Sequence, residues 1–357
     1  MLLTLGVDTH SDTHVGVVLN PLGRRLGTLS VPATAAGYAK LLTWANRFGT
    51  LERVGVEGTG SYGAGLSRFL RGKGFNVVEV NRPNRQHRRS VGKSDPTDAE
   101  AAARAVLAGS ATGKSKGADG LVEMIRTLRI ARRSAVKARS QAANQLRALL
   151  ITAPEELREK LRSLSRAKLV AATARFRPGE NPESLVEVNK FALKSLARRY
   201  LQLSEEISAL EEQIARLVSK AAPHLLALKG LSTDTAAVLL VAAGDNPERL
   251  KSEAAFANLC GVAPIPASSG KVVRHRLNRG GNRDANRALY MIAVGRMSWD
   301  ERTRTYVAKR TAEGKSKPEI IRCLKRFIAR EVYRVLTAPP HMPATATSSS
   351  NGPSLRP

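Results

Sequence analysis

The first 110 residues alternate between short apolar runs and segments with helical spacing. The apolar runs are rich in β-branched residues, which favour strands, and two of them flank the polar turn "THSDTH" as in a β-hairpin. Predicted strands cover 2–8, 15–19, 53–57 and 75–80, and predicted helices cover 37–48 and 62–74. Strands that alternate with helices in this way indicate an α/β domain with a mixed sheet.

After a Gly/Ser/Lys-rich linker, "GSATGKSKGADG", the pattern becomes helical. Residues 121–152 and 183–222 are rich in Ala, Leu, Arg and Glu, and the second segment has apolar residues at alternating steps of three and four. This heptad stripe consists of Leu193, Leu196, Tyr200, Leu203, Ile207, Leu210, Ile214 and Leu217. Two interpretations stay open: a helical hairpin within one chain, or a coiled-coil seam between copies of the chain.

The last third of the chain changes character again. "LLALKGLSTDTAAVLLVAAGD" has the pattern of a helix-hairpin-helix, whose turn amides can meet a phosphate. A loop rich in Pro, Ser and Gly follows, then more helix, and the end, "APPHMPATATSSSNGPSLRP", has the composition of a disordered tail. The predicted regions are an α/β domain at 1–112, a helical coiled-coil region at 113–222, a mainly helical domain at 223–336 and the tail at 337–357.

The chain is strongly basic, with 58 Lys and Arg against 30 Asp and Glu and a net charge of +28. Such an excess attracts a polyanion, either nucleic acid or an anionic membrane surface. No stretch approaches the roughly 20 apolar residues of a membrane span, and Asp8 interrupts any signal peptide. Because aromatic residues make up only 4%, we expect duplex or structured nucleic acid, held by its phosphates rather than by base stacking.

Cysteines and histidines give no sign of a structural metal or a disulfide framework. The two cysteines lack CxxC spacing, and the six histidines, which we interpret as surface or turn residues, lack metal-ligand spacing. The cysteine usage fits a reducing cytoplasm.

Four carboxylates stand where a predicted strand ends or a predicted helix begins. Asp8 and Glu57 end strands, while Asp95 and Asp98 open a helix at a spacing that lets both face one way. Strand ends are where sites gather in α/β sheets, so the four acids are expected to converge on Mg²⁺ or Mn²⁺ ions that assist phosphodiester cleavage. The alternative is local: Asp95 caps the helix before Pro96, Asp98 complements the helix dipole, and Glu57 occupies an ordinary turn.

Three motifs carry a family resemblance: "GVDTH", "GVEGTGSYG" and "KSDPTDAEAAARAVLAG". Together they resemble the N-terminal domain of DEDD-type insertion-sequence transposases, the IS-one-ten class, to which a pilin-gene invertase is related. That domain is similar to the RuvC-type junction resolvase, which has a ribonuclease-H-like fold. The resemblance implies that Asp8, Glu57, Asp95 and Asp98 are catalytic, metal-binding acids. It also implies that a neighbouring basic segment holds the phosphates of the scissile strand, through Arg82, Arg85, Arg88, Arg89 and Lys93.

A second candidate site lies in the loop "PASSGK", where Ser268 and Ser269 precede a glycine. Basic residues follow: Lys271, Arg274, Arg276, Arg279, Arg283 and Arg287. From the residues alone, the loop is either a solvated segment on a phosphate-binding surface or the carrier of an activated serine nucleophile. The stretch "LCGVAPIPASSGKVVRHRLNRGGNRDANRALYMIA" is similar to the C-terminal transposase domain of the same class. That similarity implies that Ser269, which directly precedes the glycine, is the covalent nucleophile, with Ser268 as the adjacent alternative.

The resemblance implies a recombinase in which the acidic site and Ser269 act on one phosphodiester. It implies donor and target DNA as substrates, a phosphoserine intermediate, a structured guide RNA, and dimers or tetramers formed through the helical region. Two other classes stay open. A RuvC-like junction nuclease would use metal-activated water instead of the serine, and a non-catalytic nucleic-acid-binding protein would need neither acids nor metal. The serine loop followed by "NRGGNRDANRALY" favours the recombinase, because neither rival requires it.

Overall fold

The computed structural model describes residues 1–80, 94–269, 272 and 274–338. They form two compact units: Met1–Glu123 combines with the chain from Val238 onward, and Met124–Ala237 forms the second unit. The predicted tail, 337–357, lies outside the described residues apart from its first two. Within the described part of the chain, no helix has both the length and the apolar character that crossing a bilayer requires.

A mixed sheet forms the N-terminal part, in the order β3-β2-β1-β4-β5-β6. Its strands are β1 (Leu2–Thr9), β2 (Thr13–Leu19), β3 (Arg25–Pro32), β4 (Thr50–Glu57), β5 (Asn76–Val80) and β6 (Gly113–Lys114). β1, β2 and β3 are antiparallel neighbours, and β4 and β5 run parallel to β1. This confirms the predicted mixed α/β fold. β3 was not predicted because it lies at the sheet edge and only Val31 among its side chains is fully buried.

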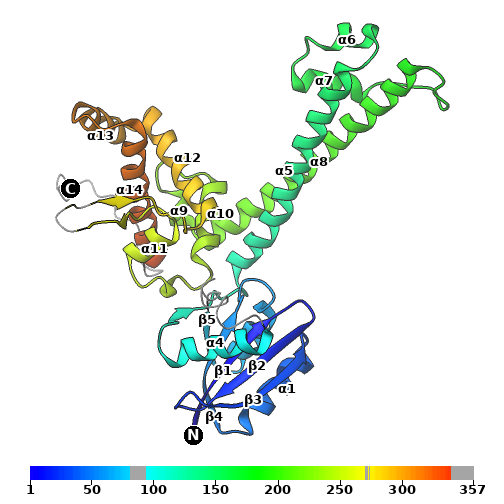
Figure 1. Ribbon diagram of the computed structural model, residues 1–357. Helices are drawn as coiled ribbons and strands as arrows, with labels where there is room; N and C mark the ends of the chain where they lie inside the picture. Colours follow the sequence, from blue (N-terminus) through cyan, green and yellow to red (C-terminus); the bar gives the residue numbers. More distant parts are fainter. Residues whose placement is uncertain (81–93, 270–271, 273, 339–357) are drawn as a thin grey trace. The chain divides into compact units, whose positions relative to one another are not determined.

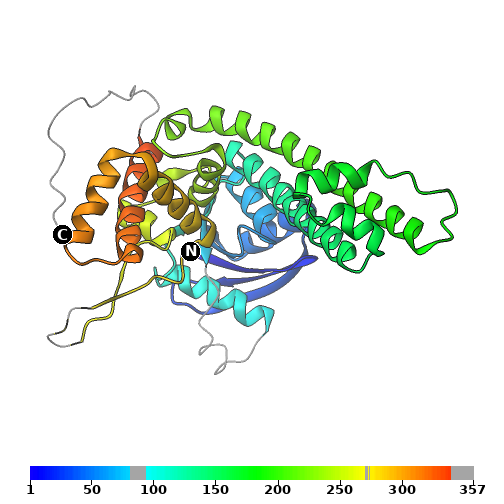
Figure 2. The ribbon, with the colours of Figure 1, turned by 90° about the horizontal axis from the view of Figure 1, so that it is seen from above.

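Helices cover both faces of the sheet (Figures 1 and 2). On one face, α1 (Ala35–Asn46) and α2 (Ala64–Gly72) pack on the alternating apolar residues of β1 and β4. On the other face lies α4 (Asp95–Leu107), whose alanines pack against β2 and β5. The sheet is therefore buried on both sides, and α4 covers the face toward which Asp8 and Glu57 project.

Two glycines let α4 lie directly on the sheet. A Cβ atom on Gly6 would overlap the carbonyl oxygen of Ala99 and the backbone nitrogen of Ala103. A Cβ atom on Gly55 would lie 3.0 Å from the carbonyl oxygen of Ala102. Since larger residues at Gly6 and Gly55 would push α4 away, these glycines set the distance between the helix and the strand ends.

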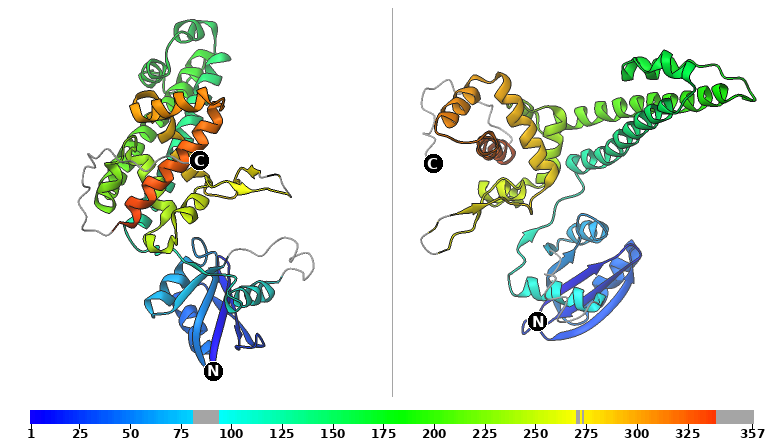
Figure 3. Two further views of the ribbon diagram at one scale, coloured as in Figure 1. Left: turned by 90° about the vertical axis from the view of Figure 1, so that its left-hand side faces the viewer. Right: turned by 45° about the horizontal axis from the view of Figure 1, so that its top comes forward.

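Two long helices, α5 (Leu121–Ile151) and α8 (Leu185–Ala221), run side by side as an antiparallel hairpin (Figures 1 and 3). Between them in sequence come α6 (Glu155–Leu161) and α7 (Arg166–Ala174), and a core that includes Leu146 and Leu193 joins all four helices.

The predicted heptad stripe of α8 faces α5. Arg132 Nε donates a 2.8 Å hydrogen bond to Glu211, and the guanidinium of Arg139 lies over the ring of Tyr200. The intramolecular hairpin therefore accounts for the first part of the stripe, where Leu193, Leu196 and Tyr200 share a core with Leu146, and a seam between copies of the chain stays a prediction.

Helices also dominate the C-terminal part. They are α9 (Pro223–Leu226), α10 (Thr233–Ala243), the 3₁₀ helix η1 (Pro247–Arg249), α11 (Glu253–Leu259), α12 (Arg283–Trp299), α13 (Glu301–Ala312) and α14 (Lys317–Thr337). In the predicted helix-hairpin-helix, the first helix, α9, has a single turn, and Gly230 takes a positive φ of 75° in the connection to α10. Strands β7 (Ile265–Pro266) and β8 (His275–Arg276) form a hairpin that projects from the helices (Figure 3).

The start of α5 is capped by a residue more than 120 positions later. The Asp245 carboxylate accepts hydrogen bonds from the backbone amides of Val122 at 2.8 Å and Glu123 at 3.2 Å. The next side chain, Asn246, accepts a bond from the Gly117 amide and donates one to the Ser115 carbonyl. These bonds hold the predicted linker between the α/β domain and α5 in one conformation.

We expect Asp245→Ala to lower the free energy of unfolding by about 1–2 kcal/mol, because two helix N-terminal amides lose their acceptor. Hydrogen–deuterium exchange should accelerate at Val122 and Glu123, with thermal unfolding as the second readout. Glu248→Ala, an exchange on neighbouring η1, serves as the control. Unchanged exchange at the start of α5 would contradict the capping role.

Candidate active site

Asp8 lies buried at the end of β1, with only 6% of the residue exposed. It follows Gly6 by two positions, so its side chain projects toward the same face of the sheet, the face that α4 covers. Burial raises the pKa of the Asp8 carboxyl, His10 opposes this rise, and the carboxylates of Asp98 and Asp95 add to it. An ionised Asp8 is therefore costly in this position unless a cation compensates it.

Glu57 ends β4, the parallel neighbour of β1, and is also buried. The register pairs Val7 with Val56, so Asp8 and Glu57 occupy matching positions at the two strand ends. Glu57 follows Gly55 by two positions and therefore shares the α4 face with Asp8. The Thr9 hydroxyl donates a 2.8 Å hydrogen bond to the Glu57 carbonyl and ties the two strand ends together.

The other two acids stand in the first turns of α4. Ser94 caps this helix, and its hydroxyl accepts a hydrogen bond from the Thr97 amide, so the interpretation of Asp95 as the cap was wrong. Pro96 occupies the second helical position, and Asp98 is buried with 6% of the residue exposed. Because a serine satisfies the helix end, the carboxylates of Asp95 and Asp98 are not needed as caps.

His10 is a residue of this site that sequence reasoning missed. Its Nε2 atom lies 3.2 Å from Asp8 Oδ2 and 3.2 Å from Asp95 Oδ1, so the imidazole bridges the strand end and the helix start. Its sequence signal is its place two residues after Asp8, at the same strand end. A search for pairs of histidines at metal-ligand spacing overlooks such a residue, because its partners are carboxylates.

The donor set fits a divalent metal ion. One ligand atom each from Asp8, His10 and Asp95 lie within 4.8 Å of one another. Buried carboxylates that disfavour each other's charge form an arrangement that a cation relieves. Glu57 and Asp98 are buried on the same side of the sheet but are not part of this group of three, so they stay predicted ligands, with oxygen atoms of the kind that Mg²⁺ and Mn²⁺ prefer.

Replacement of Gly6 should disturb this site by changing the contact between β1 and α4. We expect Gly6→Ala to destabilise the fold by about 1–3 kcal/mol, because the added Cβ meets helix backbone that has no room to yield. It should also weaken Mn²⁺ binding, measured by calorimetry, because α4 carries Asp95 and Asp98 away from Asp8. The matched control is Gly72→Ala, where a Cβ meets nothing within 4 Å. Equal Mn²⁺ affinity in both variants would show that close contact with α4 does not position the acids.

The two candidate serines differ in their surroundings. The Ser268 hydroxyl accepts a 3.1 Å hydrogen bond from the Arg274 amide, across the hairpin that β7 and β8 begin. Ser269 pairs through its backbone with Val272, next to the hairpin tip, and its side chain is exposed. Both serines are exposed, and they differ in that the Ser268 hydroxyl is hydrogen-bonded within the hairpin whereas Ser269 pairs only through its backbone among the described residues.

The predicted phosphate-binding residues fall into two groups. Arg82, Arg85, Arg88, Arg89, Lys93 and Lys271 lie outside the described residues. The others are exposed directly before β8, on β8, in the loop after it and on α12: Arg274, Arg276, Arg279, Arg283 and Arg287. The structure therefore gathers the acids in the α/β part, and the serines and arginines in the C-terminal part.

Comparison with known proteins points to one family. Residues 5–153 match a family model described as a transposase, and residues 222–308 match the model of the transposase IS116/IS110/IS902 family. The chain is 36% identical over 135 residues to the insertion element IS110 uncharacterized 43.6 kDa protein of Streptomyces coelicolor. The aligned segment covers 37% of this chain and 33% of that protein. The chain is 26% identical over 200 residues to the insertion element IS900 uncharacterized 42 kDa protein of Mycobacterium paratuberculosis, 53% of this chain and 49% of that protein.

Both family models describe transposases, and they match the two parts of the chain that hold the acids and the serines. The chain belongs to the IS110 family of insertion-element transposases. Its matches span about a third and about half of the length of these two relatives.

Proposed function

We propose that this protein is a DNA recombinase of a mobile insertion sequence, which cuts and rejoins donor and target DNA through a covalent phosphoserine. The observation that carries the proposal is the gathering of Asp8, Glu57, Asp95 and Asp98 at one face and one end of the sheet. Local structure does not explain this gathering, because Ser94 caps α4 and burial disfavours the charge of Asp8.

The acids and His10 would hold one or two divalent ions, Mg²⁺ or Mn²⁺. When bound, such ions neutralise phosphate charge and lower the barrier to attack at phosphorus. The chain's own contribution is to fix the donors: Thr9 joins the two strand ends, and Gly6 and Gly55 bring α4 against them.

Ser269 is our candidate nucleophile. Its oxygen would attack the phosphorus, the hydroxyl proton would pass to solvent, and the bond from phosphorus to one nucleoside oxygen would break. That oxygen leaves as a protonated hydroxyl, and a hydroxyl from the exchanged strand later attacks the phosphoserine and releases Ser269. The exposed arginines of β8 and α12 would stabilise the phosphate charge during both steps.

Further partners follow from charge and composition. A net charge of +28 with 4% aromatic residues suits a chain that holds DNA and RNA by their phosphates, and a structured guide RNA would supply the sequence choice by base pairing. The α5–α8 hairpin is the candidate element for dimers and tetramers. We place this activity in the bacterial cytosol, at the nucleoid.

A covalent-complex assay tests the proposal. The full chain is incubated with labelled junction DNA, Mg²⁺ and RNA that flanks the element, and protein-linked DNA is sought on a denaturing gel. Metal-dependent linked DNA supports the recombinase. Metal-dependent cleavage without linkage indicates the RuvC-like junction nuclease, and binding without any cleavage indicates a non-catalytic nucleic-acid-binding protein.

A further inference from the structure

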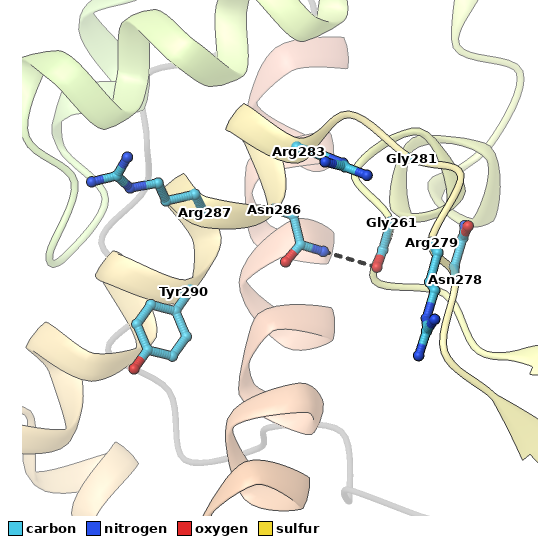
Figure 4. A pocket seen from close by; sticks show the side chains of 8 residues that line it. All are labelled: Gly261, Asn278, Arg279, Gly281, Arg283, Asn286, Arg287 and Tyr290. Atoms are coloured by element: carbon cyan, nitrogen blue, oxygen red, sulfur yellow. Dashed lines mark hydrogen bonds between the residues drawn. The ribbon is translucent and has the colours of Figure 1, made fainter. Parts of the chain in front are cut away.

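A pocket of about 430 Å³ opens at the start of α12, and none of the candidate acids lines it (Figure 4). The first two turns of α12 form one wall, and the preceding loop with Gly261 forms the other. This volume lies within the range of about 300–1,000 Å³ that is typical of small-ligand sites. The pocket is therefore large enough for a group such as a single nucleotide.

Close backbone packing and two asparagines fix the frame of the pocket. The Asn286 amide donates hydrogen bonds to the Cys260 and Gly261 carbonyls at 3.0 and 2.9 Å, and its oxygen accepts a 2.9 Å bond from Lys325. A Cβ atom on Gly281 would overlap the backbone of Gly261, so the two walls touch at this point. The cavity is thus preformed.

The asparagine donors are not available to a ligand. Both bonds from Asn286 Nδ2 go to the protein backbone. Asn278 Nδ2 contacts the carbonyl and side-chain oxygens of Asn258, and Asn278 Oδ1 accepts from the Gly280 amide. The side-chain amides of Asn278 and Asn286 are consequently not available to recognise the edge of an adenine base, which is the contact that such amides usually make.

The groups that remain open are cationic and aromatic. Arg279, Arg283 and Arg287 line the pocket and are exposed, and across the described residues no carboxylate lies within ion-pair distance of them. Tyr290 is 44% exposed, and Figure 4 shows that it projects from the same side of α12 as Arg287, one turn further along. An open phenol ring beside unpaired guanidiniums suits a ligand with one flat face and one anionic end.

We propose that this pocket binds one unpaired nucleotide of DNA or RNA. The base would stack on Tyr290, while the arginines would hold the phosphates on either side. A base inside a duplex has both faces stacked, so only a single-stranded or extruded nucleotide can enter. Since stacking on an aromatic ring is tolerant of sequence, we expect the pocket to accept different bases. This inference rests on the proposed function only in taking nucleic acid as the substrate.

Fluorescence anisotropy of the full chain in EDTA, where no metal-dependent cleavage occurs, tests this proposal. The probes are a labelled single strand and a hairpin duplex with equal numbers of phosphates, each made as DNA and as RNA. We expect Tyr290→Leu to lower the ratio of single-strand to duplex affinity about tenfold, which is the usual effect of losing one stacked base. Tyr290→Phe should keep the wild-type ratio, because it keeps the ring.

The matched control is Trp299→Leu, since Trp299 is an aromatic residue of α12 that is 54% exposed and lies outside the pocket lining. It should leave the ratio unchanged. A single strand that carries 2-aminopurine should be quenched by wild type and by Tyr290→Phe but not by Tyr290→Leu, and homopolymers of different bases should bind within about threefold of one another.

An unchanged ratio in Tyr290→Leu, or the same change in Trp299→Leu, would overturn the proposal. DNA and RNA arms that differ would identify which nucleic acid supplies the nucleotide. Since no cleavage is measured, failure of the recombinase proposal would leave this result unaffected, and failure here would leave the covalent-complex assay unaffected.

Discussion

Ser269→Ala should abolish protein-linked DNA and reduce strand transfer by about 10³-fold or more, because in the proposed mechanism the Ser269 hydroxyl oxygen forms the phosphoester bond. Ser269 lies at an exposed position beside the hairpin tip, so loss of its hydroxyl should leave the fold intact. Thermal unfolding and affinity for junction DNA should match wild type. The measurement is the yield of linked DNA on a denaturing gel at equal protein and DNA concentrations.

Ser268→Ala is the matched control, because it removes the neighbouring hydroxyl that accepts a bond from the Arg274 amide. We expect linked DNA to persist. The rate of linkage should fall only to the extent that loss of the Ser268 hydrogen bond loosens the hairpin. The opposite result, with linkage lost in Ser268→Ala and kept in Ser269→Ala, would make Ser268 the nucleophile. Linkage in neither variant would mean that the hairpin matters as a whole.

Much of the fold could be predicted from the sequence, because buried strands show themselves as apolar runs. β1, β2, β4 and β5 bury most of their side chains, and each was predicted close to its observed position. β3 was not predicted, because an edge strand needs few apolar residues and its sequence therefore lacks an apolar run. The stripe of α8 predicted a packed seam but not the partner, since the same heptads serve a hairpin and an oligomer equally well.

The candidate site was predictable only in part, because short motifs do not show which neighbour satisfies a polar group. Asp95 before Pro96 has the pattern of a helix cap, yet Ser94 occupies the cap position. The Asp95 carboxylate is therefore not needed to cap the helix. His10 joins the site through Asp95, a residue 85 positions away, and only the pairing of strand and helix reveals the contact. Likewise, the role of Ser268 in the hairpin depends on the fold of the residues after it.

Asp8→Asn should remove metal-dependent cleavage, by at least about 100-fold, and at the same time stabilise the metal-free protein. Burial and the nearby acids raise the pKa of Asp8 above its ordinary value of 3.8, so folding favours the neutral carboxyl. The stability that this group contributes is present below that ordinary value and is lost as the pH rises through the raised pKa. Asparagine is neutral at every pH and keeps this contribution.

The measurement is the unfolding temperature in EDTA between pH 3.5 and 7.5. The variant should approach wild type at the acid end and exceed it increasingly toward neutral pH. Added Mn²⁺ should raise the unfolding temperature of wild type through binding to the folded state, but not that of Asp8→Asn. Asp12→Asn, an exposed carboxylate in the same turn, should behave as wild type in both respects. If metal-free Asp8→Asn were less stable than wild type at pH 7, the ionised Asp8 carboxylate would stabilise the fold without a bound cation. The acidic cluster would then have a structural role and not a metal-binding one.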